Sequence, residues 1–105
     1  MAATVTAVAA PSARAAAEPR LLGTCPTDGF YSIAGARRIS LARACSIGIA
    51  ARKHGAVECY SPPGSQYPIA KATRRSFRGY SLTNTLYGIR FVDGATRFIF
   101  GIQCS

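Results

Sequence analysis

The last twenty residues, Leu86 to Ser105, constrain the fold more than any other stretch of this chain. Two runs of alternating residues flank Asp93-Gly94, and Asp-Gly at such a place predicts a type I′ hairpin turn, because both turn positions need a positive φ. With this turn, one apolar face of the hairpin consists of Tyr87, Ile89, Phe91, Thr96, Phe98 and Phe100. The rest of the chain must then bury that face.

On the other face of the predicted hairpin, Arg90 lies directly opposite Arg97. Like charges at that spacing cost stability unless the side chains splay apart or share an anion. Two guanidinium groups on one face can hold a phosphate or a carboxylate bidentately. Alternatively, Asp93, Glu58 or solvent relieves the repulsion, so the pair is a hypothesis for an anion site.

A helix is predicted from Leu41 to His54, where apolar residues recur at helical spacing. Ser40 is a favourable N-cap, and Gly55 is a natural residue just past the C-terminus. Lys53 and His54 suit the negative end of the helix dipole. This is the only helix that the sequence predicts.

Shorter extended segments surround this helix. They are a turn and short strand in Leu21–Ile33, a strand over Ala56–Tyr60, an extended stretch over Gln66–Ala72, a loop or sheet edge over Thr73–Gly79, and a connection over Tyr80–Asn84. The predicted fold class is α+β, with one helix (about 40–54) packed on an antiparallel sheet of three to five strands that ends in the C-terminal hairpin.

Residues 1–20 differ in composition from the rest of the chain, since alanine dominates and aromatic residues are absent. Ala15-Ala16-Ala17 offers a small-residue cleavage site, but a charged n-region is lacking. A signal peptide, a pro-segment or the remnant left after a removed signal would each explain this stretch. We expect residues 1–20 to be a disordered leader and residues 21–105 to form a single domain.

The four cysteines predict two disulfides and an oxidising compartment. Cys45 lies about 13 Å before the end of the helix, and Cys59 about 13 Å along the strand that follows it. If that strand doubles back along the helix, Cys45 pairs with Cys59 and Cys25 with Cys104. Pairing Cys25 with Cys45, or Cys25 with Cys59, remains an alternative.

The chain has 13 Lys and Arg residues against 4 Asp and Glu, a formal net charge of +9 at pH 7. This balance favours anionic partners such as nucleic acid, acidic lipid, cell-wall polymer or an acidic protein. Positive charge also keeps many small secreted proteins soluble, so charge alone does not identify a partner. No stretch approaches the roughly 20 apolar residues of a membrane span.

The densest basic stretch has cations interleaved with aromatic rings. Its residues are Lys71, Arg74, Arg75, Phe77, Arg78 and Tyr80. In proteins that bind single-stranded nucleic acid, such cations contact the phosphates and such rings stack on the bases. We therefore interpret the stretch as a candidate nucleic-acid site. The alternative is a solvated loop with one or two rings in the core.

Evidence for catalysis is weak. His54 and Glu58 are the only residues that resemble a general acid–base pair, and His54 is more typical of a helix-terminal cation. There is no G-x-S-x-G element, and every cysteine is predicted to form a disulfide. With one histidine and no C-x2-4-C pair, the sequence predicts no zinc site and no cofactor.

Several short pieces resemble one family. They are Cys25-Pro-Thr-Asp-Gly29, His54-Gly55, Gln66-Tyr67-Pro68-Ile69, Phe77-Arg78-Gly79-Tyr80, Leu82-Thr83-Asn84 and Cys104. With one helix and a final hairpin, this order resembles the small fungal guanyl-specific ribonucleases. It is more similar to the catalytically inactive ribonuclease-like effectors that plant-pathogenic fungi secrete.

Active members of that family use a sheet glutamate as base, a histidine on the final strands as acid and an arginine between them. Here Gln66 stands where the glutamate would be, and no histidine follows Tyr60. Arg90 matches the arginine one residue out of register. The resemblance therefore implies RNA binding without cleavage.

Leu41–Ile47 is also similar to the first helix of killer-toxin-like secreted effectors, although no second helix is predicted after Tyr60. We therefore expect a secreted, monomeric, non-enzymatic effector or toxin-like protein, extracellular or delivered into host cells. Its basic face would bind RNA or an acidic host partner. The alternatives are a small secreted ribonuclease using His54 and Glu58, or an antimicrobial protein acting on membranes or host proteins.

Overall fold

The computed structural model describes residues 18–27 and 30–104, so most of the predicted leader, residues 1–17, lies outside the described residues. The elements in chain order are β1 (Leu21–Thr24), β2 (Tyr31–Arg37), α2 (Leu41–Lys53), β3 (Val57–Tyr60), β4 (Ile69–Ala72), β5 (Ser76–Phe77), β6 (Tyr80–Thr85), β7 (Gly88–Asp93) and β8 (Thr96–Ile102).

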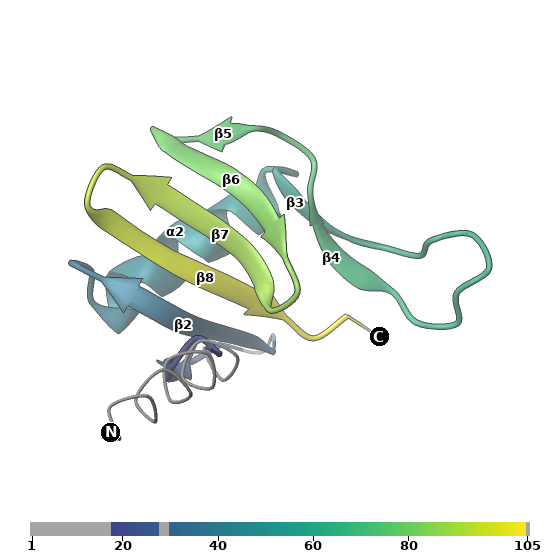
Figure 1. Ribbon diagram of the computed structural model, residues 1–105, viewed down its shortest axis with the longest axis horizontal. Coiled ribbons are helices and arrows are strands. Elements are labelled where there is room, and N and C mark those ends of the chain that lie inside the picture. Colours follow the sequence, from purple (N-terminus) through teal and green to yellow (C-terminus); the bar gives the residue numbers. More distant parts are fainter. Residues whose placement is uncertain (1–17, 28–29, 105) are drawn as a thin grey trace, which may run out of the picture.

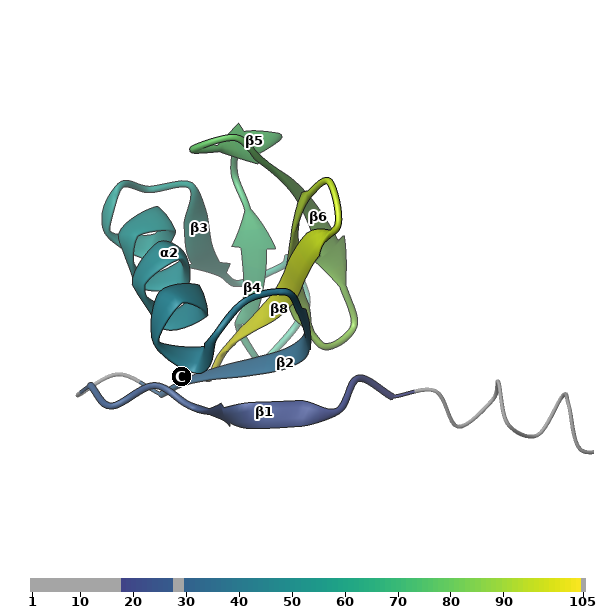
Figure 2. The same ribbon diagram turned by 90° about the vertical axis from the view of Figure 1, so that its left-hand side faces the viewer.

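These elements confirm the α+β architecture, in which one helix packs on an antiparallel sheet (Figure 1). The sheet has six strands in the order β1-β2-β8-β7-β6-β5, more than the three to five expected, and β3 and β4 form a separate two-stranded sheet. Figure 2 shows α2 and β3 on one side of the large sheet. Within residues 18–27 and 30–104 no helix covers the opposite face of that sheet, and we call it the open face.

Helix α2 begins and ends close to the predicted residues. The Ser40 hydroxyl accepts a hydrogen bond from the Arg43 backbone N–H at 3.2 Å, which confirms the N-cap. Beyond the helix, Gly55 has a φ of +80°, a conformation that glycine adopts without strain. The buried face contains small residues, and a Cβ at Gly48 would overlap the Phe100 ring. Small side chains thus let α2 lie close against the sheet.

The core lies between α2 and the covered face of the large sheet. Ile33, Ile89, Phe91, Phe98 and Phe100 are all fully buried there. The Phe91 and Phe98 rings stack with their centroids 4.7 Å apart. All of these buried residues except Ile33 belong to the hydrophobic face predicted for the C-terminal hairpin, so the prediction is confirmed at four of its six positions. At the other two, Tyr87 is half exposed and Thr96 is half-buried.

The hairpin register differs from the predicted one. Asp93 pairs with Thr96, so the two loop residues are Gly94 and Ala95. Gly94 has a φ of +62°, and Asp93 remains in the strand. A turn with glycine at its first central position needs only one positive φ, as in type II′, whereas the predicted turn needed two.

Two strands of the large sheet, β1 and β6, were not predicted from the sequence. β1 pairs with β2 at one edge of the sheet, and the segment predicted as a connection, Tyr80–Asn84, belongs to β6. β6 has the alternation of a half-buried strand, since Tyr80 and Leu82 are buried while Ser81 and Thr83 are exposed. The basic segment before it includes β5, a two-residue edge strand.

The predicted disulfide pairing is wrong. The bonds are Cys25–Cys45 and Cys59–Cys104, one of the alternatives left open. β1 passes the start of α2, where Gly23 lies against Leu41, and this brings Cys25 to the helix. Cys59 lies on the β3–β4 hairpin, which is linked to the end of β8 instead of being linked to the helix.

Candidate anion-binding site on the open sheet face

Two of the predicted anion-binding residues, Arg90 on β7 and Arg97 on β8, are exposed on the open face. They are not directly opposite each other as predicted, because Arg90 pairs with Ile99 and Arg97 with Val92. The shifted turn makes the two arginines diagonal neighbours on the same face. Diagonal side chains in a sheet remain within reach when they are as long as arginine.

A third arginine, Arg37, joins them from the last residue of β2. Its Cα partner across the strands is Arg97. The sequence did not predict this role for Arg37, because only the pairing of β2 with β8 brings it beside Arg97. The signal that could have found it is the alternation of residues in the segment that ends at Arg37. This segment forms β2, whose pairing with β8 is irregular after Ala34, where Gly35 has a φ of +57°.

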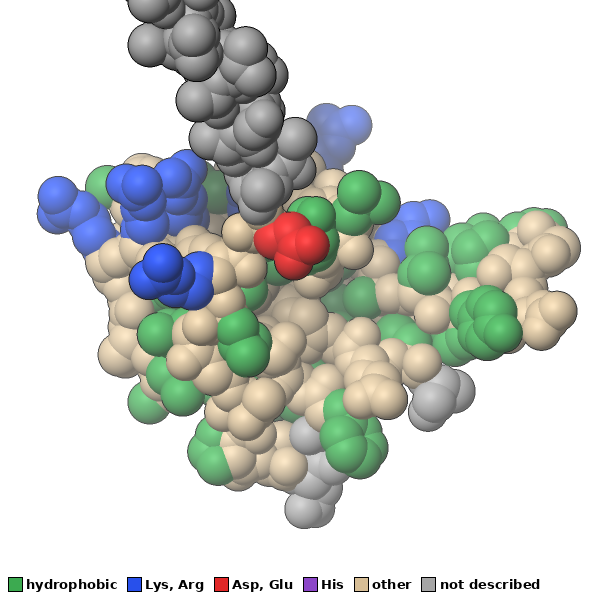
Figure 3. Space-filling model, turned by 60° about the horizontal axis from the view of Figure 1, so that its bottom comes forward, with side chains coloured by type: hydrophobic (Ala, Val, Ile, Leu, Met, Phe, Trp, Pro, Cys, Tyr) green, Lys and Arg blue, Asp and Glu red, His purple; other side chains and the backbone are tan. Residues whose placement is uncertain are grey.

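These three arginines surround a shallow depression with a volume of about 360 Å³. Its lining residues come from the chain before β1 and from β2, β7 and β8, and are Pro19, Gly35, Ala36, Arg37, Arg90, Arg97, Phe98 and Ile99. Figure 3 shows several Lys and Arg side chains close together at the upper left of the molecule, with others farther away at the top and on the right. We call this depression the arginine site.

No carboxylate lines the arginine site among the described residues, and Glu18, which precedes Pro19, is not part of it. Within the same residues, the three guanidinium groups make no hydrogen bond or ion pair with another side chain. Adjacent like charges on a sheet repel each other, and a shared anion removes that repulsion. The arrangement therefore suits an anionic group with several oxygen acceptors.

The basic stretch from Lys71 to Tyr80 does not form one site. Its two rings, Phe77 and Tyr80, are each 8% exposed, so they are core residues and cannot stack on bases. Arg74 donates a hydrogen bond to the His54 carbonyl at the end of α2, at 3.2 Å. Arg78 lies over the Phe77 ring, with its guanidinium carbon 5.1 Å from the ring centroid.

The remaining cations of this stretch lie in different places. Lys71 is on the β3–β4 hairpin, where its ammonium lies 4.6 Å from the centroid of the Tyr60 ring. Arg75 is exposed between β4 and β5, and its carbonyl accepts a hydrogen bond from the Leu82 N–H. These cations raise the local potential without converging on one ligand position.

His54 and Glu58 are both exposed. The His54 ring lies near Phe77, with the centroids 6.0 Å apart, whereas Glu58 is on β3 opposite Lys71. Among the described residues no hydrogen bond joins the two side chains. The geometry therefore gives no support to an acid–base pair at these positions.

In the described part of the chain, no group of three or more His, Cys, Asp or Glu residues is placed to hold a metal ion. No helix in residues 18–27 and 30–104 has the length and apolar character needed to cross a membrane. Comparisons with known proteins were also negative: no protein-family model, no curated protein and no solved structure matches this chain.

Proposed function

We propose that this chain is a secreted, non-enzymatic protein that binds RNA through phosphate contacts at the arginine site. The observation behind the proposal is that Arg37, Arg90 and Arg97 surround one depression that no carboxylate lines among the described residues. Arginine binds phosphate oxygens well because its planar guanidinium presents several N–H donors in a fixed geometry.

Two further features support this function. The net charge of +9 attracts polyanions over a range that depends on salt. The two disulfides suit a protein that works in an oxidising compartment. Because Phe77 and Tyr80 are buried, contacts to phosphates would dominate over base stacking. We therefore expect little preference for RNA sequence.

The test is the binding of a fluorescently labelled single-stranded RNA to the oxidised protein, measured by anisotropy at several salt concentrations. The variant combines Arg37→Gln, Arg90→Gln and Arg97→Gln. The matched control combines Arg43→Gln, Arg52→Gln and Lys53→Gln, which removes the same charge from α2. Circular dichroism of both variants checks that they fold.

We expect the plot of log affinity against log salt to lose about 2 units of slope in the arginine-site variant, since single strands contribute about 0.7 per phosphate contacted. The control should keep most of the slope. Equal losses in both variants would mean diffuse attraction instead of a site. Binding of polyglutamate with RNA ignored would indicate an acidic protein partner.

The same samples test for catalysis when the RNA is analysed on a denaturing gel. Intact RNA is the expected result. Cleavage that is lost in a His54→Ala variant would favour the ribonuclease alternative instead.

A further inference from the structure

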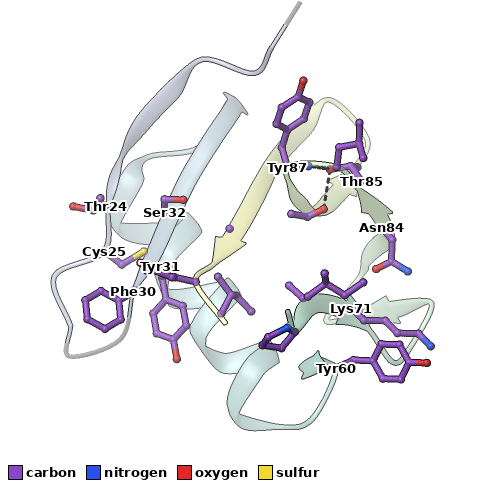
Figure 4. Close-up of a pocket in the computed structure, with 18 of the residues that line it drawn as sticks. Thr24, Cys25, Phe30, Tyr31, Ser32, Tyr60, Lys71, Asn84, Thr85 and Tyr87 are labelled. Atoms are coloured by element: carbon purple, nitrogen blue, oxygen red, sulfur yellow. Dashed lines mark hydrogen bonds between the residues drawn. The ribbon is translucent and has the colours of Figure 1, made fainter. Parts of the chain in front are cut away.

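A larger groove, with a volume of about 1060 Å³, lies between the β3–β4 hairpin and one end of the six-stranded sheet. Figure 4 shows Tyr60 and Lys71 on one side of this groove, Phe30 and Tyr31 on another, and Thr85 and Tyr87 on a third. The groove is separate from the arginine site, since the two have no lining residue in common. We call it the hairpin groove.

Exposed apolar side chains are concentrated at the hairpin groove. Of the eight large hydrophobic residues that are exposed in the described part of the chain, five line it, namely Phe30, Tyr60, Ile69, Leu86 and Tyr87. Single exposed hydrophobic residues are ordinary, but a group around one concavity is typical of a binding site.

One wall of the groove is a strand edge with free backbone groups. Thr73 N–H donates to Ala56 O at 2.8 Å, so this pair is hydrogen-bonded across β3 and β4. Bonded and non-bonded pairs alternate in an antiparallel ladder, so the N–H and C=O groups of Ala72 and Ala70 point away from β3.

These two outward residues differ in their partners. The Ala72 N–H donates to the Asn84 side-chain oxygen at 2.8 Å, which closes this end of the edge. Ala70, two residues away, lines the groove, and its backbone N–H and C=O have no partner among the described residues. Such an edge can pair with the main chain of an extended peptide.

The charge of the lining indicates what kind of peptide fits. Among the described residues that line the groove, Lys71 is the only charged one and none is a carboxylate. Its ammonium is held near the Tyr60 ring at the rim. An occupant with an acidic group would therefore be complementary in charge, whereas a basic occupant would be repelled.

We propose that the hairpin groove binds an extended peptide segment of a protein partner, which pairs with β4 at Ala70, places apolar side chains against the aromatic lining and an Asp or Glu beside Lys71. The main-chain pairing supplies orientation, and the lining supplies side-chain preference. This proposal does not depend on RNA binding at the arginine site.

The test uses a phage library of random dodecapeptides, selected against the oxidised full chain. Synthetic copies of the selected peptides are then titrated into isotope-labelled protein and followed by NMR. We expect the selected sequences to combine apolar residues with Asp or Glu. We also expect the largest shifts at the amides of Ala70 and Lys71.

The decisive variant is Ala70→Pro. It removes the outward N–H without removing a bond to β3, since that N–H does not point to β3. Ala70→Ser keeps the N–H and is the matched control. Loss of one main-chain hydrogen bond should weaken binding about fivefold in Ala70→Pro relative to Ala70→Ser.

A second measurement leaves the protein unchanged. N-methylation of the bound peptide at the residues facing β4 should weaken binding as Ala70→Pro does. In addition, Lys71→Gln should weaken the binding of the acidic peptides more than the binding of the same peptides with Glu replaced by Gln. The proposal is overturned if no peptide binds with a Kd below about 1 mM, or if Ala70→Pro and N-methylation have no effect. Two other occupants of the groove would also overturn the proposal. If the resonances of the groove residues shift only when the protein concentration is raised, the occupant is a second copy of the chain. If they shift only when sodium dodecanoate is added, the occupant is a fatty-acid chain.

Discussion

Among the described residues, five of the six largest fully buried side chains belong to the six-stranded sheet, whereas the β3–β4 hairpin contributes only Val57. The hairpin is joined to the rest of the molecule in other ways. The Cys59–Cys104 disulfide links it to the chain just after β8, and Asn84 on β6 accepts a hydrogen bond from Ala72 on β4. Hydrophobic packing thus stabilises one region, and a covalent bond with a few polar contacts attaches the other.

This difference separates the two proposed sites. The arginine site is built on strands of the large sheet, so the core behind Phe98 and Phe100 should hold it rigidly. The hairpin groove lies at the boundary between sheet and hairpin. Its width should therefore follow the hairpin, which has few buried apolar contacts and is expected to open locally at low free energy.

The largest effect should come from the sheet. Phe100→Ala removes a fully buried ring that stacks on Tyr31 and packs against Gly48 of α2. We expect the free energy of unfolding to fall by about 3–5 kcal/mol, measured by urea denaturation. Tyr67→Ala, at a ring that is 72% exposed, is the control and should change it by less than about 0.5 kcal/mol. Similar losses in both variants would contradict the division between core and hairpin.

The second effect compares the two disulfides. Cys59–Cys104 spans 45 residues and Cys25–Cys45 spans 20, so loss of loop-closure entropy predicts stabilisation of about 4 and about 3 kcal/mol respectively. Replacing Cys59 and Cys104 with Ala should therefore be the more destabilising change, and hydrogen exchange should increase mainly in β3 and β4.

The matched control for that change replaces Cys25 and Cys45 with Ala. It should speed exchange around β1 and α2 and leave the hairpin amides protected. If removal of Cys59–Cys104 instead exposes the amides of β7 and β8 as fast as those of β3, the hairpin is part of the same cooperative unit as the sheet.

The smallest effect should come from Asn84. Asn84→Ala removes the hydrogen bond to the Ala72 N–H, at an expected cost of about 1 kcal/mol. The change should appear as faster exchange of the Ala72 amide, because β4 then loses its polar link to β6. Ser81→Ala, at an exposed position on the same strand, is the control. An unchanged rate at Ala72 would mean that the disulfide alone holds the hairpin in place.

The local elements were predictable because their signals are local. Ser40 before an apolar pattern and Gly55 after it predicted α2, and the N-cap bond is present. Alternation around Asp93-Gly94 predicted the final hairpin and the buried positions of Phe91 and Phe98. In each of these cases the deciding interactions join residues that are close in sequence.

The candidate site was predicted in part. Arg90 and Arg97 were recognised from the hairpin, but their register was wrong, because one glycine with a positive φ was enough for the turn. Arg37 was missed, since only the pairing of β2 with β8 brings it to Arg97. Phe77 and Tyr80 were interpreted as residues that stack on bases, but both are buried in the core.

By itself, the sequence determined the fold class, the helix, the final hairpin and the number of disulfide bonds. Only the tertiary structure decided which cysteines pair, which arginines meet and where a groove opens. The physical reason is that these features depend on strand order, and paired residues of the neighbours β2 and β8, from Arg37 and Arg97 to Tyr31 and Ile102, are 60 to 71 positions apart in the sequence. Pairings of that kind depend on packing of the whole domain instead of local propensity.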